Sequence, residues 1–186
     1  MDTYFESTTH VSNYKPNTFS THIMAKVPQK YIPKHLTRKD KKRAKRELLL
    51  SRKRYKNKKY YTRKKVKSFK SKKSSHVVNA ERIYNIKNAS PTKEFAKKTG
   101  CSLRGLKDIV KKGQGAYFSS GSRPNQTGHS WGIARLASAV TGGKSAVVDY
   151  HILKKECKKT SKALKLANKA KRKYKTLRVR NKVKLK

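Results

Sequence analysis

Apolar residues recur at helical spacing in several separate stretches of this chain, which predicts a mainly α-helical protein with little or no sheet. The clearest stretch follows Thr127 or Ser130, either of which can open a helix, and Gly142 and Gly143 come directly after it as its end. Its small residues, beside the single tryptophan, favour close packing. We therefore expect this helix in the core, whose predicted members are Tyr117, Trp131, Leu136 and Tyr150.

Three shorter helices are predicted before it. The first spans about Ser75 to Ile86. The second spans Thr92 to Thr99, with Ser90 as N-cap, Pro91 as the first helical residue and Gly100 as its end. The third begins after Ser102, and Gly113 is expected to stop it; its apolar face carries Leu103, Leu106, Ile109 and Val110.

The second and third of these helices form a helix-turn-helix pattern. It could place Arg104, Lys107, Lys111 and Lys112 against a nucleic-acid groove. Two short helices joined at a glycine are, however, more often a way to close a small helical core. The segment that follows, Gly113 to Thr127, has the densest loop composition in the chain. It is expected either to form an anion-binding nest, with Arg123 adding charge, or to be a rigid structural connection.

The first basic segment begins with a helix predicted from about Arg38 to Tyr55, with Thr37 as N-cap and Asp40 in the first turn. This helix has few apolar positions, so its cationic faces must meet solvent or a partner. Between Lys56 and Ser75, cations then alternate with aromatic and apolar residues: Tyr60, Tyr61, Val66 and Phe69. Such a composition is typical of surfaces that coat phosphates and stack on bases, and equally of a solvated linker.

The C-terminal segment predicts a basic amphipathic helix from about Lys155 to Tyr174, which Ser161 can initiate. It could bind a membrane surface, dock into a groove of a partner, or remain a solvated tail. Beyond it, Val179, Val183 and Leu185 alternate with cations, a pattern that would suit an edge strand added to another protein's sheet.

The distribution of charge divides the chain into the same segments as the predicted helices do. Lys and Arg outnumber Asp and Glu by 52 to 9, giving a net charge of +43 on 186 residues. Twenty of the cations lie between residues 38 and 73, and sixteen between residues 154 and 186. The predicted organisation is an extended N-terminal arm (1–30), a basic helix and linker (31–75), a small helical centre (76–157) and a basic C-terminal arm (158–186). The fold class expected is a small helical centre with long extended basic arms.

A chain of this charge needs an anionic partner to be compact, and the candidates are nucleic acid, an anionic membrane and an acidic protein surface. The candidate anion-binding or partner-binding residues are Arg38, Lys42, Arg43, Arg46, Arg52, Arg54, Arg63, Lys64, Arg104, Arg123, Arg172, Arg178 and Arg180. No apolar run is long enough to span a bilayer, and the first residues lack the pattern of a signal peptide.

Enzymatic chemistry has little support. Gly142 to Ser145 resembles the end of a phosphate-binding P-loop, but Ser138 stands where that motif needs glycine. His129, Ser130 and Asp149 contain the residue types of a hydrolytic triad without a nucleophile elbow. Cys101 and Cys157 are expected to be free thiols in a reducing compartment. We expect no catalytic residues, no metal site and no cofactor.

Several stretches carry a family resemblance: Tyr31 to Lys42, Ser68 to His76, Gly113 to Thr127, His129 to Gly143, and Val148 to Leu153. Together they resemble an uncharacterised domain encoded by large double-stranded DNA viruses of the chlorella-virus and mimivirus kind, over about residues 30–157. Gly128 departs from the proline expected there in relatives.

The resemblance implies a viral protein and, at this size and charge, a virion component made in the host cytoplasm or nucleus. The function expected is that of a minor capsid protein whose basic arms tie major and other minor capsid subunits together, facing viral DNA or an anionic inner membrane. The alternative is a protein that neutralises the packaged genome with little sequence preference.

Overall fold

The computed structural model describes the backbone of residues 27–182 and the side chains of residues 27–174, and over these residues the protein is mainly helical and contains no sheet. A 3₁₀ turn, η1, precedes eight α-helices. Their bounds are η1 Gln29–Tyr31, α1 Arg38–Lys56, α2 Ser75–Tyr84, α3 Lys93–Thr99, α4 Leu103–Ser119, α5 Gly128–Val140, α6 Lys144–Val148, α7 Tyr150–Glu156 and α8 Lys162–Lys182.

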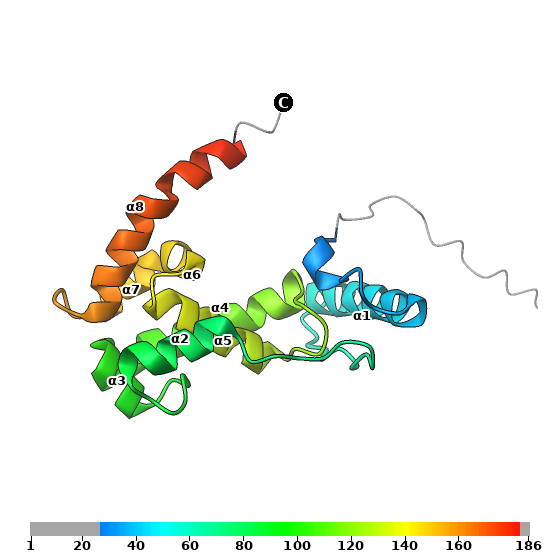
Figure 1. The fold of residues 1–186 in the computed structure, drawn as a ribbon, viewed down its shortest axis with the longest axis horizontal. Helices are drawn as coiled ribbons and strands as arrows, with labels where there is room; N and C mark the ends of the chain where they lie inside the picture. The colour runs from blue at the N-terminus through cyan, green and yellow to red at the C-terminus, as the bar shows by residue number, and fades with distance from the viewer. Residues whose placement is uncertain (1–26, 183–186) are drawn as a thin grey trace, which may run out of the picture.

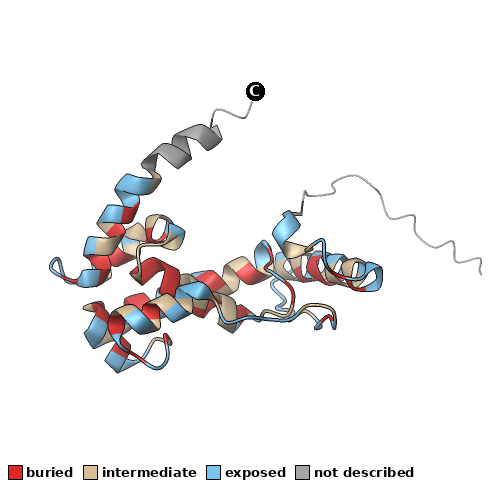
Figure 2. Cartoon of the chain, in the orientation of Figure 1, coloured by how far each residue is buried: buried red, intermediate tan, exposed pale blue. Residues whose placement is uncertain are grey.

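The centre of the molecule is an antiparallel hairpin of α4 and α5. The two helices approach closely where Gly113 faces Gly132: a Cβ built on Gly113 would lie 2.6 Å from the Cα atom of Gly132. Helices α2, α3, α6, α7 and α8 surround one end of this hairpin, whereas α1 lies at its other end (Figure 1). Buried residues gather where the hairpin meets these neighbours, as Figure 2 shows.

Most predicted helices are present, but several boundaries differ from the prediction, and α6 and α7 were not predicted. The C-terminal helix begins at Lys162 and not at about Lys155, because the chain leaves α7 at Glu156. Gly113 does not stop α4, which continues six residues further to Ser119, because the glycine serves the close crossing with α5 and not a turn. The N-cap of α3 is Thr92, whose hydroxyl accepts a hydrogen bond from the Phe95 N–H group; Ser90 instead donates its hydroxyl hydrogen bond to Asn88.

The extended character expected of the arms is not seen in the part of the C-terminal segment that is described. Its backbone is helical as far as Lys182, so the edge strand predicted there is wrong at Val179. Helix α8 packs on the centre through Ala163, Leu164, Ala167 and Ala170, all buried. The N-terminal arm as far as residue 26, together with Val183 and Leu185, lies outside the described residues.

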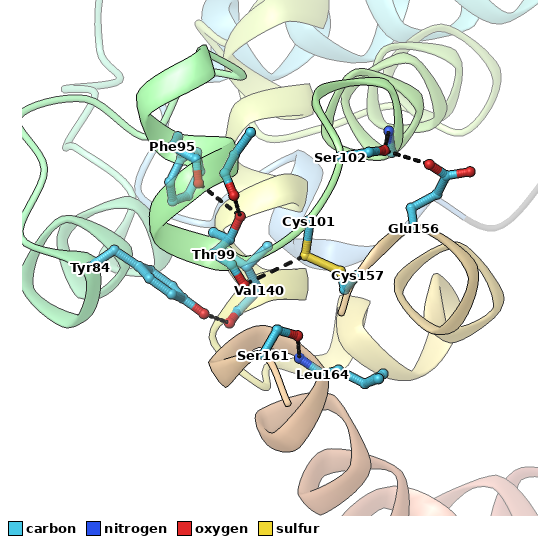
Figure 3. Close-up of a disulfide and its surroundings, with 12 residues drawn as sticks. Tyr84, Phe95, Thr99, Cys101, Ser102, Val140, Glu156, Cys157, Ser161 and Leu164 are labelled. Carbon is cyan, nitrogen blue, oxygen red and sulfur yellow. Dashed lines mark hydrogen bonds between the residues drawn. A yellow bond between two sulfur atoms is a disulfide. The ribbon is translucent and has the colours of Figure 1, made fainter. Parts of the chain in front are cut away.

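The expectation of free thiols is wrong, because Cys101 and Cys157 form a disulfide (Figure 3). Cys101 lies in the turn between α3 and α4, and Cys157 directly follows α7, so each lies just beyond the end of a helix. Backbone hydrogen bonds hold the two segments together: Ser102 N–H donates to Glu156 C=O, and Lys158 N–H donates to Gly100 C=O. The two cysteines are 56 positions apart, so no local pattern in the sequence indicates that the fold brings them together.

Of the four predicted core residues, Tyr117 and Leu136 are fully buried. Tyr150 is partly buried against the core, and its hydroxyl donates a hydrogen bond to Asn168. Trp131 is also only partly buried, because it lies at the close of the first turn of α5, near the end of the hairpin, with Tyr31 edge-on against it. The tryptophan therefore joins the N-terminal turn to α5 and does not fill the core.

Candidate nucleic-acid interface

Two buried carboxylates fold the first basic segment into a compact unit, which we call the basic lobe (residues 38–73). Asp40 accepts hydrogen bonds from the N–H and hydroxyl groups of Ser68, both at 2.7 Å. Glu47 accepts them from the Tyr61 hydroxyl at 2.7 Å and the Lys64 N–H group at 3.0 Å. The segment after α1 is therefore not a solvated linker, because it folds back along the helix and is bonded to Asp40, Glu47 and Ser51 of that helix.

The hydrogen bonds to these carboxylates favour their charged forms. Those from Ser68 lower the pKa of Asp40 below its usual value. Burial pushes the pKa of Glu47 upward, but the hydrogen bonds from Lys64 and Tyr61 outweigh it, and the net pKa is lowered. The bond to Glu47 in turn raises the pKa of Tyr61. Both carboxylates are thus ionised at neutral pH and directed into the lobe.

The α4–α5 loop holds the lobe from the other side. The side chain of Asn125 accepts a hydrogen bond from the Val66 N–H group and donates to the carbonyl groups of Val66 and Phe69. The guanidinium of Arg63 bonds to Ser122 and lies 4.3 Å from the ring centre of Tyr117. Of the two roles expected for this loop, the contacts fit the rigid structural connection.

A groove of about 990 Å³ opens on the lobe between the first turns of α1 and the turn at residues 67–68. It is lined by Thr37, Lys39, Asp40, Lys42, Arg43, Arg46, Lys67 and Ser68. Five of these eight side chains are cationic and one, Asp40, is anionic, so the groove carries a net positive charge. The groove therefore presents uncompensated positive charge on a folded surface.

The structure brings three of the predicted site residues, Lys42, Arg43 and Arg46, together in this groove. Two others, Lys39 and Lys67, were missed. Lys39 lies three, four and seven residues before the predicted trio, the spacing of one helix face, so the pattern could have identified it. Lys67 reaches the groove only because Ser68 bonds to Asp40, an interaction that no local pattern indicates.

Several other predicted binding residues are engaged within the fold. Arg52 donates two hydrogen bonds to the carbonyl oxygen of Ser120, and the guanidinium of Arg54 lies 4.6 Å from the ring centre of Tyr61. Together with Arg63, these residues stabilise the packing of the lobe. The exposed candidates outside the groove are Arg38, Arg54, Lys64, Arg104, Arg123 and Arg172; the side chains of Arg178 and Arg180 lie outside the described part.

The residues imagined as a hydrolytic triad have separate structural roles. Ser130 forms a capping box with Thr127 at the start of α5. Asp149 is fully buried and bonded by the Arg135 guanidinium at 2.7 and 2.8 Å, with the ammonium group of Lys112 at 3.3 Å. This ion cluster joins α4, α5 and the α6–α7 turn. It also engages one of the cations expected of the helix-turn-helix.

The P-loop-like sequence spans the turn from α5 to α6 and the first two residues of α6. Gly142 has a positive φ of 73°, and a Cβ there would lie 3.0 Å from the carbonyl oxygen of Leu166, so the glycine lets α8 approach this turn. Among residues 27–174, no group of three His, Cys, Asp or Glu side chains could hold a metal ion. Over the same described part, no helix is long and apolar enough to cross a membrane.

Comparison with known proteins gives a single finding. No curated protein and no solved structure matches the chain. A family model does match, over residues 28–155, the range that holds the basic lobe, the α4–α5 hairpin and all of α7 but its last residue. The chain therefore belongs to DUF5824, a family of unknown function.

Proposed function

We propose that this protein is a non-enzymatic structural protein that binds nucleic acid through its basic lobe, with little preference for sequence. The observation that carries the proposal is the groove, in which five cationic side chains surround a carboxylate already bonded inside the lobe. Lysine and arginine side chains on such a surface would neutralise backbone phosphates and release their condensed counterions. Little sequence preference follows because phosphate contacts carry no base information.

The lobe is suited to a polyanion because its form does not depend on one. Asp40, Glu47 and Asn125 hold the backbone of the segment after α1, so the cations of the groove are placed before any partner arrives. A preformed surface avoids much of the ordering cost that a disordered basic tail pays when it binds. In the setting implied by the viral resemblance, the partner would be the packaged double-stranded DNA genome.

A minor capsid protein is the second candidate, and one observation favours it. Helix α8 extends out of the body beyond its packed first turns, as Figure 1 shows. A projecting basic helix is a suitable device to reach a neighbouring subunit in a lattice. Location would separate the two roles: a genome-binding protein would leave purified particles with the DNA, whereas a capsid protein would stay with an emptied shell.

Duplex binding as a function of salt tests the first proposal. We expect the wild-type protein to bind a mixed-sequence 30-base-pair duplex with an affinity that falls steeply as salt rises, measured by fluorescence anisotropy. The triple variant Lys39→Gln, Lys42→Gln, Lys67→Gln should bind more weakly. It should also lower the slope of log affinity against log salt by roughly 0.9 for each phosphate that the variant no longer neutralises.

A variant with the same loss of charge provides the control. Lys93, Lys97 and Lys98 are exposed on α3, which lies at the opposite end of the hairpin from the lobe. Their replacement by glutamine should change affinity and salt slope much less than the groove variant does. Equal losses in both triple variants would mean that net charge alone drives binding, and a salt-independent affinity would contradict the proposal itself.

A further inference from the structure

The folded lobe uses most of the apolar side chains in its second half. Val66 is buried, with 3% of its surface exposed. The hydroxyl of Tyr61 bonds to Glu47, and Phe69 stacks against His35 with ring centres 5.8 Å apart. Of the aromatic and apolar residues that this segment interleaves with cations, only Tyr60 remains 73% exposed. Tyr60 is therefore the aromatic ring of this segment that the fold leaves available to a partner.

Tyr60 is held in place although it is exposed. Its ring meets that of Phe118 edge to face, with centres 5.1 Å apart, and the ring of Tyr55 lies 6.1 Å away. Phe118 is part of α4 and Tyr55 of α1, so the support comes from two helices that pack against each other. Tyr60 therefore presents an aromatic surface on a fixed base, and little conformational entropy remains to be lost on binding.

The backbone that leads to Tyr60 is also fixed. The N–H groups of Asn57, Lys58 and Lys59 donate to carbonyl groups in the last turn of α1, and Lys58 adopts a positive φ of 58°. This turn presents three exposed ammonium groups, those of Lys56, Lys58 and Lys59, next to Tyr60 in the chain. An aromatic face flanked by cations is complementary to a base flanked by phosphates.

We propose that Tyr60, supported by Phe118 and Tyr55, is a stacking platform for an unpaired base of single-stranded nucleic acid. The proposal rests on the proposed function for the phosphate contacts but adds a ligand class that the groove does not specify. A duplex hides the faces of its bases within the stack, whereas a single strand offers them. The same chain would thus bind duplexes through charge alone and single strands through charge and stacking.

Two oligonucleotides of equal charge test this platform. The first is a thymidine 20-mer and the second is an abasic 20-mer with the same phosphates but no bases. We expect wild-type protein to bind the thymidine strand about tenfold more tightly in anisotropy titrations, because each stacked base contributes measurably to affinity. Tyr60→Ala should remove this preference, whereas Tyr60→Phe, which retains the ring, should preserve it.

Duplex binding and folding provide the controls. Tyr60→Ala should bind the 30-base-pair duplex within about twofold of wild type and give an unchanged circular dichroism spectrum, since the ring is largely exposed. Equal wild-type affinity for the two 20-mers, or an unaltered preference in Tyr60→Ala, would overturn the platform while the duplex result still supports the groove. Absence of duplex binding would instead overturn the proposed function.

Discussion

At the scale of single residues, two carboxylates decide how the first basic segment folds. Cations outnumber acids by twenty to two between residues 38 and 73, so mutual repulsion opposes compaction. Asp40 and Glu47 are both buried, and each bonds to a backbone N–H group of the returning chain as well as to a side-chain hydroxyl. The two negative charges thus bind the returning segment to α1 from inside the lobe, and the outer surface of the lobe stays cationic.

The stability of the lobe should consequently fall in acid. A carboxyl whose pKa is lowered in the folded state stabilises that state above its unfolded pKa of about 4, and this contribution disappears as pH falls through the folded value. We expect Glu47→Gln to lower the free energy of unfolding by about 1 kcal/mol at pH 7, and we expect this loss to shrink as pH falls through the lowered pKa of Glu47. Urea unfolding of wild type and variant, followed by circular dichroism at a series of pH values, measures this difference in stability.

Glu94→Gln is the matched control, because Glu94 is an exposed carboxylate on α3 and its replacement changes net charge equally. It should leave the free energy of unfolding nearly unchanged at every pH of the series. If the two variants lost the same stability at pH 7, net charge would explain the loss, and the buried hydrogen bonds of Glu47 would not.

At the scale of elements, the α4–α5 hairpin depends on glycines placed inside helices. Gly113 and Gly132 face each other across the crossing, and a Cβ on Gly132 would lie 2.7 Å from the carbonyl oxygen of Val110. Glycine lowers helix propensity by up to about 1 kcal/mol relative to alanine. The closer packing of the two backbones offsets that cost. One end of the resulting hairpin contacts the lobe, and the other end contacts the remaining helices.

Replacing two glycines of α4 by alanine should therefore change the free energy of unfolding in opposite directions. We expect Gly113→Ala to lower the free energy of unfolding by about 1–3 kcal/mol, because its methyl group would overlap the backbone of α5. Gly115→Ala should raise it by about 0.5–1 kcal/mol, because the nearest atom to its Cβ is the Tyr55 hydroxyl at 3.6 Å. Thermal unfolding of the two variants provides the comparison, and equal signs would contradict the close crossing.

The elements also show what the sequence could predict. Helix α1 with its Thr37 cap, helix α2 and the end of α5 before Gly142 follow from local signals, and each is confirmed. The return of the segment after α1 could not be predicted, since it depends on hydrogen bonds between residues 14 to 59 positions apart. The predicted end of α4 at Gly113 was wrong for a related reason. A glycine that ends a helix and a glycine that lets two helices pack closely look the same in the sequence.

At the scale of the whole molecule, the positive charge is carried by folded elements as far as the chain is described. The lobe lies at one end of the hairpin, and α8 leaves the other end (Figure 1). Cations are therefore presented from two fixed directions around a weakly charged centre. A single anionic partner that contacted both the lobe and α8 would have to be extended. A nucleic-acid strand has such a shape.

The disulfide ties α8 to the end of the hairpin on which that helix packs. It joins the α3–α4 turn to the start of the segment that carries α8, and it closes a loop between residues 56 positions apart (Figure 3). Closing a loop of this length removes conformational freedom from the unfolded chain, so reduction should lower the free energy of unfolding by about 2–4 kcal/mol. Urea unfolding with and without a phosphine reductant measures the change.

The double variant Cys101→Ser, Cys157→Ser is the control. It should unfold at the same urea concentration as the reduced wild type, and the reductant should not change that midpoint, since the chain has two cysteines. Hydrogen exchange should accelerate in α8 more than in α1, because α1 lies far from the bridge. An unchanged urea midpoint on reduction would show that the buried face of α8 and the backbone hydrogen bonds of Ser102 and Lys158 hold this helix to the centre without the disulfide.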